Sequence, residues 1–91
     1  MSLTVYWTNQ FKKDYEKAKA RGLDIKKLDE VIIKLSNQEP LTENYRDHKL
    51  TGEYKDYREC HIQPDWLLIY YIVSDKLILV LSRTGTHSDL Y

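Results

Sequence analysis

The sequence is poor in the residues that carry disulfides, tight phosphate loops and membrane spans. It has one cysteine, two prolines and three glycines among 91 residues. A lone cysteine, Cys60, excludes an internal disulfide framework and fits a reducing compartment, so we expect a cytoplasmic protein. No apolar run approaches the roughly 20 residues that span a bilayer, and no segment resembles a signal peptide, so no membrane partner is expected. A Gly-rich phosphate loop and a nucleophilic serine elbow are also lacking.

Length and charge set further bounds. The length suits one domain, residues 1–91. The formal net charge is zero, which gives no overall attraction to nucleic acid. Residues 12–27 nevertheless hold seven basic side chains against three acids, a local charge of +4. Such a face is often ordinary solvated surface, but it also suits contact with phosphates. The seven residues are Lys12, Lys13, Lys17, Lys19, Arg21, Lys26 and Lys27.

The first half of the chain predicts a strand followed by two helices. Residues 3–7, LTVYW, are β-branched and aromatic, as in a strand. Apolar residues then recur every three or four positions over 11–18 and 25–35, which indicates two amphipathic helices. Gly22 suits the left-handed turn between them. These two helices are predicted to form a hairpin.

The second half predicts a loop over 38–53 and then three strands. The strands cover 57–62, 66–73 and 76–83, and the turn signals QPD and SD separate them. The predicted order is therefore β-α-α-β-β-β. It indicates an α+β fold in which the helical hairpin packs on a mostly antiparallel, four-stranded sheet.

The two short turns predict which residues face one another. A two-residue loop at 74–75 would place Trp66 opposite Arg83. A three-residue loop at 63–65 would place His61 opposite Leu67, and Ile62 opposite Trp66. Asp65 lies in that loop. One end of the sheet would thus gather a histidine, an aspartate, a tryptophan and an arginine.

His87 completes this predicted cluster, since it follows Arg83 by only four residues. Two histidines can act as acid and base near neutral pH, and an arginine can bind phosphate oxygens. An aromatic ring at the rim can stack on an unpaired base. The combination suits metal-free RNA cleavage by attack of the 2′-hydroxyl on the adjacent phosphorus. A zinc site of His61, Asp65 and His87 is the rival interpretation, but no spaced Cys/His pairs support it.

Each member of the cluster also has a plain structural interpretation. A strand histidine is commonly half-buried and hydrogen-bonded, an aspartate after proline forms turns, and a tryptophan belongs to the core. Cys60 alternates away from His61 on its strand, so we predict a core residue and not a nucleophile. His48 lies in the long loop, where the pattern does not place it.

Three motifs resemble a known family. They are D-H-x-L-x-G from Asp47, Y-R-x-x-H-I-x-P-D-W from Tyr57, and R-x-G-T-H-x-x-L-aromatic from Arg83. Together they resemble the YafQ branch of the RelE/ParE toxin superfamily, strongly so over residues 45–91. The resemblance implies a RelE-like fold and the toxin of a type II toxin–antitoxin pair. It also implies a ribosome-dependent mRNA endonuclease without metal or cofactor, whose partners are an antitoxin, ribosomal RNA and mRNA.

The resemblance also implies the site residues. They are the catalytic residues His48, His61, Asp65, Arg83 and His87, and the substrate-binding residues Trp66 and Tyr91. In this scheme His87 protonates the leaving 5′-oxygen, and Arg83 neutralises charge on the scissile phosphate. The basic residues of 12–27 would contact the ribosome, and an acidic or amphipathic antitoxin segment would cover the site.

Two other activities stay open from the sequence. One is a ParE-like toxin that poisons gyrase without cleaving RNA, and the other is a degenerate toxin that only binds antitoxin. The histidine set favours the enzyme, because a pure binding protein has no use for it. The oligomeric state and the codon preference are not predicted.

Overall fold

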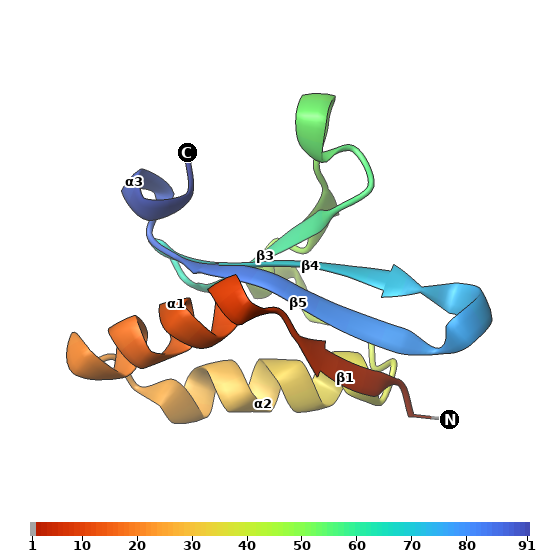
Figure 1. Ribbon diagram of the computed structural model, residues 1–91, viewed down its shortest axis with the longest axis horizontal. Coiled ribbons are helices and arrows are strands. Elements are labelled where there is room, and N and C mark those ends of the chain that lie inside the picture. The colour runs from red at the N-terminus through yellow and green to blue at the C-terminus, as the bar shows by residue number, and fades with distance from the viewer. Residues whose placement is uncertain (1) are drawn as a thin grey trace.

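The computed structural model describes residues 2–91 and is shown in Figure 1. Its main elements are β1 (Thr4–Trp7), α1 (Asn9–Ala20), α2 (Ile25–Ser36), β2 (His48–Lys49), β3 (Arg58–Gln63), β4 (Trp66–Val73), β5 (Ile78–Gly85) and α3 (His87–Leu90). Three short 3-10 helices lie between them: η1 (Glu43–Tyr45), η2 (Gly52–Tyr54) and η3 (Ser74–Lys76).

The strands form one sheet in the order β1-β5-β4-β3-β2. Only β1 pairs in parallel, with β5, and the other neighbours are antiparallel. The α+β class and the mostly antiparallel sheet are confirmed. The count of four strands is wrong, because the two-residue strand β2 adds a fifth within the segment predicted as a loop.

The two faces of the sheet are covered differently. Helices α1 and α2 pack side by side against one face, while α3 and the η2 segment rise from the other (Figure 1). We call this second face the open face. Of residues 2–91, no helix is both long and apolar enough to cross a membrane.

Both long helices begin where a side-chain oxygen satisfies a backbone N–H. The hydroxyl of Thr8 accepts from the amide of Phe11 at 3.1 Å, and Asp24 accepts from the amide of Lys26 at 3.2 Å. Gly22 between the helices has a φ of 80°, which other residues rarely adopt. The hairpin geometry thus follows from local sequence.

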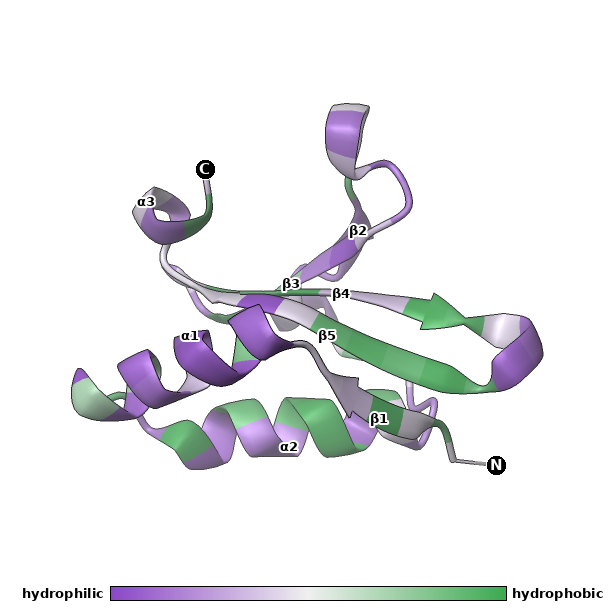
Figure 2. Ribbon diagram, viewed as in Figure 1, coloured by the Kyte–Doolittle hydropathy of each residue, from purple (hydrophilic) through white to green (hydrophobic). Residues whose placement is uncertain are grey.

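The core lies mainly between the helices and the sheet. Its largest fully buried side chains include Trp66, Tyr70 and Phe11. Figure 2 shows apolar residues along β4 and β5 and on the sheet-facing side of α2. A smaller cluster of Leu67, Ile69 and Leu90 lies on the open face and carries α3.

The predicted register of β4 and β5 is wrong. The connection is not a two-residue loop: η3 and the left-handed Leu77, with a φ of 54°, place Val73 opposite Ile78. An irregularity next to Ile69 shifts the pairing again. Arg83 therefore faces Ile69 and not Trp66.

The predicted register of β3 and β4 is correct from Arg58 to His61 and wrong at the end of β3. His61 lies opposite Leu67, as expected. Gln63, and not Ile62, lies opposite Trp66, because the register shifts between His61 and Gln63.

Candidate active site

Strand pairing places the main polar residues in one row across the open face. His48 pairs with Glu59, Glu59 with Ile69, and Ile69 with Arg83. Residues directly opposite on paired strands share a face. The row therefore runs from β2 to β5 on the face that carries α3, and His61 lies two residues along β3 from Glu59.

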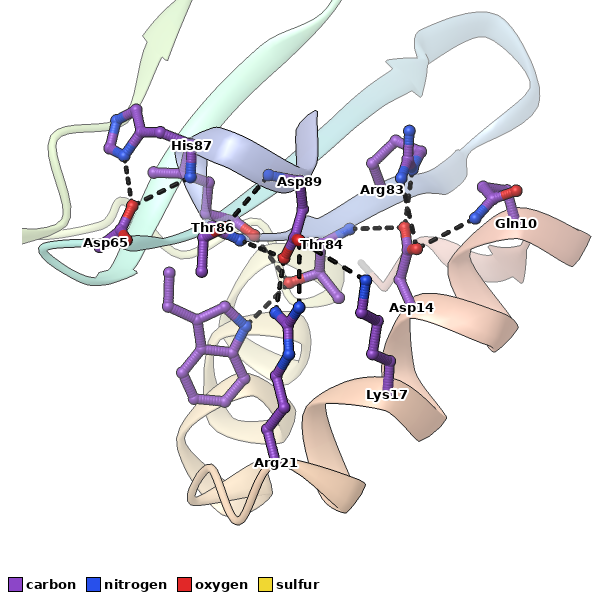
Figure 3. Close-up of polar contacts among 12 residues, drawn as sticks. Gln10, Asp14, Lys17, Arg21, Asp65, Arg83, Thr84, Thr86, His87 and Asp89 are labelled. Carbon is purple, nitrogen blue, oxygen red and sulfur yellow. Dashed lines mark hydrogen bonds and ion pairs between the residues drawn. The ribbon is translucent and has the colours of Figure 1, made fainter. Parts of the chain in front are cut away.

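His87 is fixed by Asp65. The Nδ1 atom of His87 lies 2.6 Å from Asp65 Oδ1, and the same oxygen accepts from the His87 amide at 2.9 Å (Figure 3). These hydrogen bonds, the amide first, lower the pKa of Asp65, which therefore stays ionised and can only accept. Nδ1 of His87 must then carry the hydrogen, and Nε2 is the nitrogen that remains to exchange a proton.

The other two histidines have the same tautomer for a similar reason. Nδ1 of His48 lies 2.6 Å from the carbonyl oxygen of Arg46, and Nδ1 of His61 lies 3.3 Å from that of Pro64. A carbonyl oxygen only accepts, so both Nδ1 atoms donate. The ring of His61 lies 5.9 Å from that of His87 and 6.5 Å from that of His48. Three imidazoles with available Nε2 atoms thus share the open face.

The residue before His48 anchors the loop that carries it. Asp47 accepts from the Tyr70 hydroxyl at 2.5 Å and from Arg58 Nη2 at 3.2 Å. Burial first, and then the bond to Asp47, raise the pKa of Tyr70, so the hydroxyl stays a donor. The Asp-His pair of the first motif therefore combines an anchor of the loop with an imidazole on the open face.

Glu59 is a site residue that the sequence analysis missed. Its Oε1 atom lies 3.6 Å from Nε2 of both His48 and His61, and the hydroxyl of Tyr91 donates to its Oε2. The residue is only 6% exposed. The alternation of a strand contained the signal, since Glu59 and His61 are two positions apart and must share a face.

Arg83 is held by a residue of α1. Its Nε atom donates to Asp14 Oδ2 at 2.7 Å and Nη2 to Oδ1 at 3.4 Å. In Figure 3 the guanidinium points toward Asp14, which also contacts Gln10. The hydrogen bond to Asp14 raises the pKa of Arg83, with smaller contributions from neighbours that include Tyr54. Asp14 was not predicted from the sequence.

The C-terminal segment is anchored at several points. Thr86 and Asp89 form a capping box at the start of α3, and Leu90 is buried in the open-face cluster. Arg21 binds Asp89 through two hydrogen bonds of 2.6 and 3.1 Å, and Lys17 lies 3.5 Å from it (Figure 3). The C-terminal end of α1 and the last helix of the chain, α3, therefore meet at Asp89.

Residues 3–91 match the family described as bacterial toxin of type II toxin–antitoxin system, YafQ. The chain belongs to the YafQ toxin family. The mRNA interferase toxin YafQ of Escherichia coli K12 is 41% identical over 88 residues, which cover 96% of this chain and 94% of that protein.

Solved structures of YafQ-type toxins share the fold of this family member. The crystal structure of the E. coli DinJ–YafQ toxin–antitoxin complex matches with a TM-score of 0.89 and 39% identity, covering 100% of this chain and 99% of that one. A metal-bound toxin from Helicobacter pylori matches with a TM-score of 0.92 and 42% identity, covering 98% and 99%. The resemblance read from the motifs is confirmed.

The two aromatic residues assigned to substrate binding differ in exposure. Trp66 is 2% exposed and faces the helices, where its Nε1 donates to the Thr84 hydroxyl at 3.0 Å. This burial agrees with its plain interpretation as a core residue, and its contact with substrate stays a prediction. Tyr91 is 60% exposed, and the ring of Tyr54 contacts it edge-on at 6.2 Å.

The seven basic residues of 12–27 are all exposed in this YafQ-family toxin. Two of them have internal partners, since Lys17 and Arg21 bind Asp89. Lys19 pairs with Glu16 on the same helix at 3.6 Å. Contact of this face with the ribosome stays a prediction.

The H. pylori relative raises the question of a metal in this family member. Within residues 2–91, no group of three or more His, Cys, Asp and Glu side chains is arranged to hold a metal ion. The zinc alternative of His61, Asp65 and His87 does not fit, because Asp65 binds His87 while His61 faces Glu59. We derive no catalytic step through a metal.

Proposed function

We propose that this chain is an mRNA interferase, an endoribonuclease that cleaves mRNA on the ribosome. One observation carries the proposal: three imidazoles on the open face have Nδ1 bonded to an acceptor and Nε2 available for proton transfer. Cleavage through the 2′-hydroxyl needs one group to remove a proton and another to supply one. A protein that acts only by binding needs neither.

In the proposed reaction, Nε2 of His48 or His61 removes the proton of the 2′-hydroxyl. The 2′-oxygen bonds to the adjacent phosphorus, the bond to the 5′-oxygen breaks, and Nε2 of protonated His87 gives that oxygen a proton. The products are a 2′,3′-cyclic phosphate and a 5′-hydroxyl. Asp65, which stays ionised, stabilises the charged imidazole of His87 before the transfer.

Arg83 stabilises the negative charge that develops on the phosphate. Asp14 engages its Nε and Nη2 atoms, which leaves Nη1 for a phosphate oxygen. The side chain is 34% exposed, so substrate can reach it. Donors that are already oriented stabilise such charge without reorganising during the reaction.

The partners of the proposed function are mRNA, the ribosome and an antitoxin protein. The exposed basic face of α1 and α2 would bind the phosphates of ribosomal RNA. A protein that acts on ribosomes in this way would work in the cytoplasm. The E. coli relative is described in a complex with its antitoxin DinJ. An acidic or amphipathic antitoxin segment would inhibit this chain by covering the open face.

The test maps mRNA 5′ ends by primer extension after a short pulse of expression. The native chain, His87→Ala and Arg83→Ala are compared, with Lys76→Ala as a control in the distant η3 turn. We expect new cuts within translated codons for the native chain and the control alone. A parallel reaction on purified, programmed ribosomes after chelator treatment of the protein should cleave at the same rate.

Two results would contradict the proposal. Growth arrest with intact messages would favour a non-nucleolytic target such as gyrase. Folded protein that causes neither arrest nor cuts would favour a degenerate toxin that only binds antitoxin.

A further inference from the structure

Glu59 places a carboxylate on the open face, where the proposed function requires RNA to bind. The open face must admit phosphates, and a carboxylate there repels them. Glu59 is also 6% exposed, and burying a carboxylate is costly unless it is paired and hydrogen-bonded. The repulsion of phosphate and the burial of the charge are both unfavourable, so we expect Glu59 to have a role that offsets them.

The two carboxylate oxygens of Glu59 have different partners. Oε1 lies 3.6 Å from Nε2 of His48 and 3.6 Å from Nε2 of His61. Since both imidazoles donate through Nδ1, an imidazole becomes positively charged when its Nε2 takes the proton of the 2′-hydroxyl, and a carboxylate beside Nε2 stabilises that charge. One oxygen of Glu59 therefore directs the two Nε2 edges toward a common point and stabilises the positive charge that an imidazole gains there during the reaction.

The second oxygen holds the end of the chain. The Tyr91 hydroxyl donates to Oε2, and the pKa of Tyr91 is raised, by burial of the hydroxyl first and by this hydrogen bond next. The hydroxyl is thus a donor throughout the physiological pH range. Tyr91 as a whole is 60% exposed, and its ring touches Tyr54 edge-on, so a base can still reach the residue.

We propose that Glu59 is a positioning residue of the active site, which orients His48 and His61 through one carboxylate oxygen and the ring of Tyr91 through the other. Through these two contacts Glu59 sets the position of the imidazoles that deprotonate the 2′-hydroxyl relative to the aromatic ring on which a base stacks. This inference rests on the proposed cleavage of mRNA.

The experiment compares the native chain with Glu59→Gln, Tyr91→Phe and Glu39→Gln. Glu59→Gln keeps the shape and removes the charge, and Tyr91→Phe removes only the hydroxyl. Glu39→Gln is the matched control, because Glu39 is exposed in the loop after α2, away from the open face. The measurements are kcat and KM for cleavage on programmed ribosomes, and ¹⁵N spectra of the imidazoles in the free protein at pH 7.

For Glu59→Gln we expect kcat to fall about ten- to a hundredfold, as for other residues that orient a functional side chain. KM should stay constant or decrease, because a charge that repels phosphate has been removed. For Tyr91→Phe we expect a loss of about two- to tenfold in kcat/KM, the effect of one hydrogen bond. The control should match the native chain.

The ¹⁵N spectra separate positioning from a general loss of structure. In Glu59→Gln the ¹⁵N signals of His48 and His61, which face Glu59, should change, while those of His87, which Asp65 holds, should stay as in the native chain. Shifts at all three histidines, or at none, would overturn the inference. So would an unchanged kcat, or a raised KM with native kcat, in a chain that cleaves mRNA. If the native chain does not cleave, the proposed function fails, and unchanged His48 and His61 signals would then overturn the inference separately.

Discussion

Replacing Asp14 by alanine tests how the edge of the sheet and Arg83 are fixed together. Strand β1 pairs with β5 only from Ile78 to Leu81, so the amide of Thr84 lies beyond its reach. Asp14 accepts from that amide at 3.2 Å and from Arg83 Nε at 2.7 Å, and it is 7% exposed. The Asp14 carboxylate thus accepts the hydrogen bond that a carbonyl group of a neighbouring strand would otherwise accept.

The expected loss of stability comes mostly from the amide. Leaving the buried N–H of Thr84 without a partner costs about 1–3 kcal/mol. The ion pair with Arg83 adds only about 0–1 kcal/mol, because the arginine side chain is 34% exposed. We expect a total of about 2.5 kcal/mol. With an unfolding entropy of roughly 2.1 cal/mol/K per residue, 91 residues give a decrease in Tm of about 13 °C.

Thermal melts followed by circular dichroism measure this decrease, and two further variants separate its parts. Arg83→Ala removes the ion pair but leaves the Thr84 bond, so Tm should change by no more than about 5 °C. Gln10→Ala removes a single partner of Asp14 at an exposed position and should melt with the native protein. If Asp14→Ala melts within about 3 °C of the native chain, or if Arg83→Ala is as damaging, the role assigned to the Thr84 amide is wrong.

Three further predictions concern the C-terminal segment and the core. Gly85→Ala should displace Asp89 and reduce cleavage while the sheet stays folded, because an added Cβ would lie 2.8 Å from Asp89 Oδ2. NMR spectra of α3 measure the displacement, and cleavage assays measure the loss of activity. Hydrogen bonds from Arg21 first, and from the Thr86 amide next, hold the pKa of Asp89 well below its usual range. The ionised carboxylate therefore supports the docking of α3 fully above about pH 4, and this support is lost as the pH falls further. The amide signals of residues 87–90 should follow that change, and in Asp89→Asn they should be displaced at every pH. Burial raises the pKa of the Cys60 thiol, so a thiol reagent should label it only after the protein is denatured, whereas rapid labelling of the native protein would contradict its place in the core.

The sequence predicted the fold where local pattern decides structure. Helices α1 and α2 follow apolar periodicity, a capping residue at each start and a glycine between them. Strand β4 has the predicted bounds, 66–73, because a continuous apolar run of this length between two turns is typical of a covered strand. These elements gain their main stability from the same residues that signal them.

Register was predicted less well, because it depends on turn geometry. The dipeptide Ser74-Asp75 suggested a two-residue loop, but the chain continues through η3 to Leu77 in a left-handed conformation. A leucine gives no local signal for positive φ, where glycine or asparagine is typical. Two additional residues in the turn then moved every partner of β5, including that of Arg83.

The candidate site was predicted by motif more than by geometry. His61, Asp65 and His87 do lie together, and His48, which only the resemblance supplied, lies beside His61. Trp66 lies in the core, as its plain structural interpretation predicted, and its assignment to substrate binding stays a prediction. Glu59 was overlooked, because no motif position drew attention to it.

The contacts that assemble the site explain why local pattern could not reveal it. Arg83 depends on Asp14 and Asp89 on Arg21, so the active-site strand and the final helix are both fixed by α1 at the other end of the chain. Tyr91 depends on Glu59 of β3. Each bond closes a long loop, whose entropic cost is met only once the sheet has formed. The geometry of the site is therefore a property of the completed fold, and the last residues of the chain are held by α1, β3 and the apolar residues of β4.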